Sequence, residues 1–97
     1  MAYVVTVSWK ARPGEEDAVA SLLQQVAEAS RREPGCLLFW IHRSLEEPGR
    51  FFLYEQFVSE AAFREHGASD HVRRFVLEDA VARLDERRRE TYEVLST

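Results

Sequence analysis

The chain begins with two segments whose hydrophobic residues recur at different intervals. Residues 3–11 alternate apolar and polar side chains, which predicts a β-strand with one buried face. From residue 15 to residue 32 the apolar side chains recur at steps of three and four, which predicts an amphipathic helix. Pro13-Gly14 and Pro34-Gly35 end these elements because both pairs favour turns. The buried faces are formed by Tyr3, Val5, Val7, Trp9, Val19, Leu22, Leu23 and Val26.

Two more strands are predicted at residues 36–43 and 50–58, both rich in aromatic and branched side chains, with a hairpin turn at Pro48-Gly49 between them. Ser59 can cap a short helix that ends near His66, and Ser69 can cap a second helical piece. A last strand is predicted at residues 91–95, after the polar run ERRRE. The order is β-α-β-β-α-β.

This order predicts a single α+β domain over residues 1–97, of ferredoxin-like βαββαβ type, with an antiparallel sheet and helices on one face. The two middle strands are apolar on both faces, and the helices can cover only one of them. The uncovered face would carry Trp40, Phe52 and Tyr54, a large apolar patch for a monomer. We therefore expect a homodimer with its two sheets packed face to face.

The charge balance weighs against nucleic acid as a partner. Thirteen basic and seventeen acidic residues give a net charge of −4, and the one dense basic run, Arg87-Arg88-Arg89, is flanked by Glu86 and Glu90, which favours a solvated surface. Cys36 is the only cysteine, so no intramolecular disulfide or cysteine-based zinc site is possible. No segment is typical of a signal peptide or a membrane span, and we expect a cytoplasmic protein without a membrane partner.

His66 and His71 are the first candidates for chemistry, because histidine can accept and release a proton near neutral pH. His66 follows Phe63 by three residues and would face the same side of its helix. Histidines at helix ends are also often surface caps or partners of the helix dipole. Their spacing of five residues crosses Gly67 and differs from a helical zinc pair, and no third ligand is indicated, so we expect no metal.

Aromatic side chains could line a pocket for a flat substrate: Trp9, Phe39, Phe57, Phe63 and Phe75. Most such residues would serve as core, with two or three touching a ligand. Glu55 shares a strand face with Phe51, Leu53 and Phe57, where a carboxylate needs a partner, and a structural hydrogen bond or ion pair is the favoured role. The chain has no glycine-rich phosphate loop and no nucleophile-elbow motif.

The segment YEQFVSEAAFREHGASDH at residues 54–71 resembles the antibiotic biosynthesis monooxygenase (ABM) family of dimeric α+β barrel proteins. Glu55, Phe57, Ser59, Phe63, His66, Ser69 and His71 fill the places of the family's short motifs. The segments VSWKARPGEEDAV and EPGCLLF also resemble the family, so the likeness extends over nearly the whole chain. Three differences are that Asp70 replaces a common proline, that Phe57 stands where many relatives have tryptophan, and that the chain contains no asparagine.

The resemblance implies a cofactor-independent monooxygenase that oxidises a small aromatic quinol or anthrone-like substrate with O2. His66 or His71 would be the base, with Trp9 and Phe57 shaping the cavity. An asparagine implicated in several relatives cannot act here. Two alternatives stay open: an isomerase or tautomerase that uses the same histidines, and a dimer that binds a ligand without catalysis.

Overall fold

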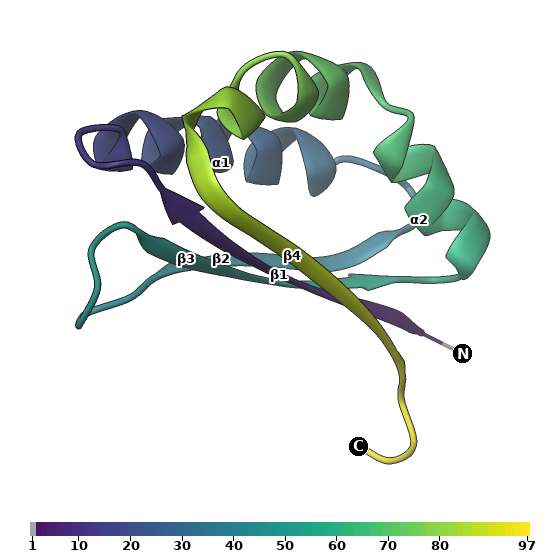
Figure 1. Ribbon diagram of the computed structural model, residues 1–97. Coiled ribbons are helices and arrows are strands. Elements are labelled where there is room, and N and C mark those ends of the chain that lie inside the picture. Colours follow the sequence, from purple (N-terminus) through teal and green to yellow (C-terminus); the bar gives the residue numbers. More distant parts are fainter. Residues whose placement is uncertain (1) are drawn as a thin grey trace.

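The computed structural model describes residues 2–97, and its four strands form one antiparallel sheet in the order β2-β3-β1-β4. Figure 1 shows the helices on one face of this sheet. The predicted α+β class and the βαββαβ order are therefore confirmed. The elements are β1 (Tyr3–Ala11), α1 (Glu16–Ser30), β2 (Cys36–Arg43), β3 (Arg50–Phe57), α2 (Glu60–Gly67), η1 (Val72–Leu77), η2 (Ala80–Arg83) and β4 (Leu84–Glu93).

The core lies between the sheet and the helices, because the alternating strands direct one set of side chains toward α1 and η1. β1 and β3 pair with Val5 opposite Glu55, Val7 opposite Leu53 and Trp9 opposite Phe51. Directly opposed residues of an antiparallel pair share a face, so these side chains form one inner surface. The apolar stripe predicted for the first helix packs there and is buried throughout: Val19, Leu22, Leu23 and Val26.

Both predicted helix caps are present. The Ser59 hydroxyl accepts a hydrogen bond from the backbone N–H of Ala62 at 3.1 Å, which begins α2. The Ser69 hydroxyl accepts one from the N–H of Val72 at 3.3 Å, at the start of the helical residues 70–71 that lead into η1, a π-helical turn. Each cap satisfies a backbone donor that has no partner within its helix.

The last strand differs from the prediction of residues 91–95. β4 begins at Leu84 and includes the polar run, with Arg87 opposite Trp9 and Arg89 opposite Val7 on β1. An edge strand is held by backbone hydrogen bonds along one side, so it needs no apolar pattern. The polar run is thus part of the sheet, and alternation directs Arg87 and Arg89 to its inner face.

Strict alternation along residues 36–43 would place Leu37 on one face with Phe39 and Ile41, and the structure departs from it. The pairing of β2 with β3 shifts register between Cys36 and Leu38, and the Leu37 side chain is 57% exposed. A bulge of this kind breaks the strict alternation of a strand. The inner face of β2 is therefore formed by Phe39 and Ile41 alone of the three.

No helix within residues 2–97 combines the length and the apolar character needed to cross a membrane.

Candidate functional site

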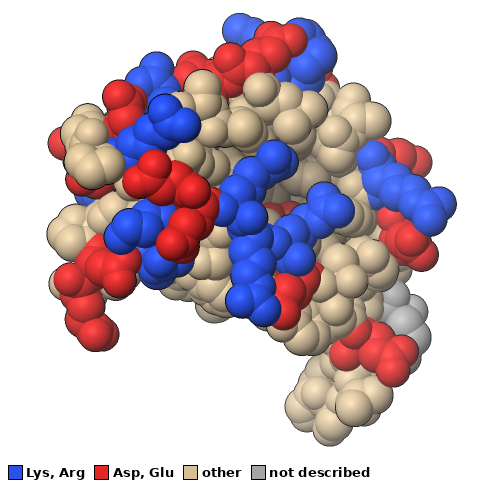
Figure 2. Space-filling view, viewed as in Figure 1, with Lys and Arg blue, Asp and Glu red and all other residues tan. Residues whose placement is uncertain are grey.

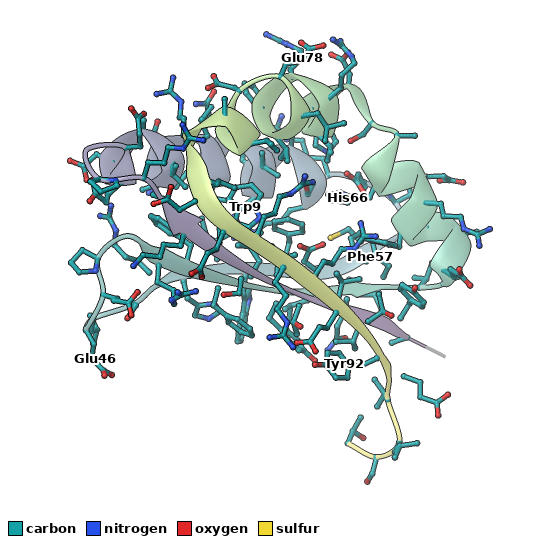
Figure 3. The ribbon with its side chains drawn as sticks, in the orientation of Figure 1. Trp9, Glu46, Phe57, His66, Glu78 and Tyr92 are labelled. Carbon is teal, nitrogen blue, oxygen red and sulfur yellow. The ribbon has the colours of Figure 1, made fainter. Side chains whose placement is uncertain are left out.

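A cavity of about 100 Å³ lies between the inner face of the sheet and the helices. Trp9, Phe39 and Phe63 contribute aromatic walls, and Glu55 and His66 contribute the polar groups. Arg87, Arg88 and Arg89 of β4 lie at its edge. Figure 3 shows Trp9, Phe57 and His66 between the helices and the sheet, and Tyr92 on the opposite side of the sheet. In Figure 2, basic side chains lie across a hollow beneath the helices.

His66 is positioned by α2 and buried among aromatic rings. Its ring centroid lies 5.5 Å from that of Phe39, 5.1 Å from that of Phe57 and 6.1 Å from that of Phe63. Burial among these rings lowers the pKa of His66 below its ordinary value, although the adjacent Glu33 carboxylate acts in the opposite direction. The imidazole is consequently neutral at pH 7 and has one nitrogen free to accept a proton.

Glu33 determines which nitrogen that is. Its Oε2 lies 2.9 Å from Nδ1 of His66 and 2.6 Å from Nε2 of His71. A carboxylate can only accept hydrogen bonds, so Nδ1 of His66 carries the ring proton and donates a hydrogen bond to Glu33. Nε2 of His66 is then unprotonated. This is the arrangement in which a carboxylate orients a histidine that acts as a base.

The α1–β2 loop brings Glu33 to the histidines because Gly35 lets the loop approach α2 closely. A Cβ atom at Gly35 would lie 2.5 Å from Cβ of Ala62, closer than side chains tolerate. The Gly35 carbonyl also accepts a hydrogen bond from the N–H of Val58 at 2.9 Å. Glycine here thus serves a close contact between backbone segments, one of the roles for which it is favoured.

Glu55 of β3 is the second polar group of the cavity. Its residue is 3% exposed, and its Oε1 is buried without a hydrogen-bond partner among residues 2–97. Burial, reinforced by the nearby charge of Glu33 and opposed by Arg89, raises the pKa of Glu55 to about 8. Near neutral pH the carboxyl group is mostly protonated and can donate a hydrogen bond.

The base and the acid meet in the cavity. Oε1 of Glu55 lies 3.9 Å from Nε2 of His66, beyond direct hydrogen-bond distance. A substrate oxygen could lie about 2.8 Å from both atoms at once. The pair can therefore take a proton from a bound molecule and donate one to it within the same cavity.

Glu33, His66 and His71 also present donor atoms that all lie within 4.8 Å of one another, a group that could hold a divalent cation. The sequence indicated two of these donors and no third. One carboxylate and two imidazoles suit zinc or iron(II). A cation bound at Nδ1 of His66 would require that nitrogen to lose its proton, and the neutral ring would then carry its proton on Nε2. Nε2 could no longer act as a base, so metal binding and the base role are competing uses of this histidine.

The sequence-predicted site residues occupy four different places. Trp9, Phe39, Phe63 and His66 line the cavity. Three others do not line it. His71 contacts Glu33, Phe57 is fully buried beside His66, and Phe75 is half-buried with the Arg74 guanidinium 5.3 Å from its ring centroid.

Four residues of the site were given no catalytic or binding role from the sequence: Glu33, Glu55, Arg87 and Arg89. The sequence favoured a structural role for Glu55 and a solvated surface for the arginines. For Glu55 the signal was present, because alternation placed a carboxylate among inward apolar residues. For Arg87 and Arg89, the flanking acidic residues made the basic run resemble a solvated surface and obscured its place on a strand. Glu33 lies 33 positions from His66 along the chain, and only the packing of the α1–β2 loop against α2 brings them together.

The chain resembles known proteins both in sequence and in fold. A family model described as antibiotic biosynthesis monooxygenase matches residues 2–78. No curated protein matches the chain. The Pseudomonas aeruginosa protein PA3566 superposes with a TM-score of 0.92 at 25% identity, over 98% of this chain and 95% of that one.

Two further solved structures are similar. The Shewanella oneidensis protein SO0527 has a TM-score of 0.88 at 30% identity, over 94% of this chain and 88% of that one. A Nitrosomonas europaea protein, provisionally named an antibiotic biosynthesis monooxygenase, has a TM-score of 0.91 at 26% identity, over 97% of this chain and 90% of that one.

Proposed function

Because the chain belongs to the antibiotic biosynthesis monooxygenase family, we propose that it is a cofactor-independent monooxygenase that oxidises a small aromatic quinol with O2. The observation that supports this most directly is that Nε2 of His66 lies 3.9 Å from Oε1 of Glu55, a buried carboxyl group whose pKa is raised to about 8. A quinol needs only a base, a donor for the developing anion and a dry cavity to react with oxygen.

In the proposed reaction, Nε2 of His66 removes the proton of a quinol hydroxyl, and Glu33 stabilises the imidazolium that forms. The Glu55 carboxyl donates a hydrogen bond to the phenolate oxygen. The electron-rich anion passes electrons to O2, one oxygen atom enters the ring and the other leaves as water. The quinol and one O2 thus give a hydroxyquinone and one water, with all four electrons supplied by the substrate, so no external reductant is needed.

The volume of the cavity favours a substrate of one ring. At about 100 Å³ it is smaller than the ~300–1,000 Å³ of most ligand pockets. A cavity of roughly 150 Å³ can hold benzene, so even a single ring would extend from this space toward the solvent at the β4 edge. A one-ring quinol is therefore favoured over a three-ring anthrone, and the ring would lie against Trp9 and Phe39.

Oxygen consumption by metal-stripped protein tests the proposal. We expect the protein to oxidise one-ring quinols at rates well above their autoxidation rates. Added zinc or iron(II) should leave these rates unchanged or reduce them. Uptake that appears only after iron(II) is added would contradict a cofactor-free reaction and would reassign Glu33, His66 and His71 as metal ligands. Absence of uptake with every quinol would contradict the oxygenase proposal.

Replacing Glu33 with glutamine is expected to lower kcat by at least about 100-fold, because the charge that orients and stabilises protonated His66 is lost. Glu33 is a positioning residue, so its test includes a pH profile. Without the charge that raises the pKa of His66, the acidic limb of kcat/KM should move to lower pH. Glu46→Gln, at the exposed hairpin, is the matched control. An unchanged limb in Glu33→Gln would exclude this positioning role.

An isomerase or tautomerase is the second candidate, and the same pair of groups favours it. A base at Nε2 of His66 and an acid at Glu55 can move a proton between carbon and oxygen of a small carbonyl compound without O2. Anaerobic exchange of the substrate's α-proton in D2O, followed by NMR, distinguishes the two. Exchange without oxygen uptake would favour the isomerase.

We also propose that a second copy of the chain covers the outer face of the sheet. Trp40 is 57% exposed and Phe52 is 44% exposed, and their strands β2 and β3 are neighbours in the sheet. Tyr92 is 48% exposed on the same outer face. Large apolar side chains gathered on one exposed face are typical of an interface. Two such faces are self-complementary in a two-fold dimer.

Trp40→Glu combined with Phe52→Glu is expected to convert the dimer to a monomer, because two carboxylates would be buried without partners in each half of the interface. Sedimentation velocity measures the change. Leu45→Glu is the control, since Leu45 is fully exposed in the β2–β3 hairpin. A wild-type protein that sediments as a monomer at micromolar concentration would contradict the dimer.

A further inference from the structure

Two arginines reach the cavity from the edge strand. In the pairing of β1 with β4, Arg87 lies opposite Trp9 and Arg89 lies opposite Val7, and all four residues line the cavity. The Arg89 guanidinium lies 5.3 Å from the centroid of the Phe63 ring, which forms part of the aromatic wall. Both residues are exposed, so their cationic ends stand where the cavity meets solvent.

These two arginines are also unpaired, which is unusual in this chain. Among residues 2–97, most basic side chains lie within 4.0 Å of a carboxylate, and Arg31 donates to the backbone carbonyl of Phe39. Within the same residues Arg74, Arg87 and Arg89 have neither kind of partner. Two of the three unpaired cations therefore stand at one cavity, although the chain as a whole carries a net charge of −4.

The carboxylates nearest the cavity do not neutralise them. Glu55 has its pKa raised to about 8 and is mostly uncharged near neutral pH. Glu33 accepts hydrogen bonds from both His66 and His71. The entrance is thus cationic, the walls are mainly apolar, and the buried polar groups are a base and an acid. A positive potential at the mouth of an apolar cleft attracts anionic ligands.

We propose that Arg87 and Arg89 bind a carboxylate substituent of the substrate, which makes the substrate class a one-ring aromatic acid that carries the reacting hydroxyl groups. The inference rests on the proposed function, because it assigns the substrate of that same cavity. Guanidinium groups suit a carboxylate because they donate paired hydrogen bonds to its two oxygens. With the carboxylate held at the mouth, the ring enters between Trp9 and Phe39, and a hydroxyl group reaches His66.

Anaerobic isothermal titration at pH 7 tests this with a matched pair of probes, 2,5-dihydroxybenzoate and its neutral amide, 2,5-dihydroxybenzamide. We expect the acid to bind at least about tenfold more tightly than the amide, in line with hydrogen bonds to a charged group. Arg87→Gln combined with Arg89→Gln should remove that preference and leave amide binding unchanged. Both substitutions are at exposed positions and should not affect folding.

Arg74→Gln is the control, because Arg74 is an unpaired arginine outside the cavity lining, and it should keep the full preference. Equal affinity for acid and amide, absence of binding for both, or equal losses for both ligands in the double variant would overturn the inference. A preference for the acid without oxygen uptake would contradict the monooxygenase and leave carboxylate binding intact. Oxygen uptake with equal kcat/KM for the two quinols would support the monooxygenase and contradict carboxylate binding by the two arginines.

Discussion

Replacing His66 with glutamine is expected to lower the rate of quinol-dependent oxygen uptake by about 10²- to 10⁴-fold, the usual contribution of a general base. Glutamine can still donate to Glu33, so the polar contact at 2.9 Å can be kept while the basic nitrogen is lost. Oxygen uptake under substrate saturation measures kcat. The loss should be in kcat rather than in KM, because the base acts in the transition state.

The pH profile separates a lost base from a disturbed cavity. In the wild type, kcat/KM should rise through the pKa of His66, which lies below its ordinary value of 6.5, and fall through the pKa of Glu55 at about 8. His66→Gln should lose the acidic limb. The control is His42→Gln, the same substitution at an exposed histidine of β2 whose ring contacts the Phe52 carbonyl. Wild-type turnover in His66→Gln would remove His66 from the mechanism.

Replacing Glu55 with glutamine is expected to make the protein more stable than the wild type at pH 9 and similar to it at pH 5. The pKa of Glu55 is about 8 in the folded chain and near 4.5 in the unfolded chain. Between these values the folded state holds a proton that unfolding releases, so the free energy of unfolding falls by about 1.4 kcal/mol per pH unit as pH rises. Over the whole window the loss amounts to roughly 3–5 kcal/mol.

Urea denaturation at pH 5, 7 and 9 measures this effect as the difference between variant and wild type. Glutamine does not titrate, so the difference should widen steadily in favour of the variant as pH rises. His66 contributes the opposite trend, with stability lost as pH falls below 6.5, but it is common to both proteins and cancels. Glu46→Gln should show a difference that does not change with pH. The same constancy for Glu55→Gln would mean that Glu55 titrates as an ordinary exposed carboxyl.

These two expectations come from one feature of the cavity. A single buried space lowers the pKa of a base and raises the pKa of an acid, so each group is held near neutral pH in the form its proposed role requires. The unpartnered oxygen of Glu55 destabilises the fold at high pH. A polar atom left without a partner in this way is expected where a ligand supplies one.

The sequence determined what local physics controls. Hydrophobic period and turn residues were enough for the element order and the inner faces of β1 and β3, and the capping residues located the starts of α2 and η1. The same patterns directed Trp9, Phe39 and Phe63 into the interior, where they line the cavity. His66 was placed by its three-residue spacing from Phe63.

Only the tertiary structure decided how these residues are combined. Glu33 reaches His66 across 33 positions because a glycine loop packs closely on α2, a contact that no local pattern encodes. Arg87 and Arg89 face the cavity because β4 pairs with β1 through its backbone, so the register is independent of side-chain polarity. Glu55 holds its proton because of burial, and burial depends on everything packed around it.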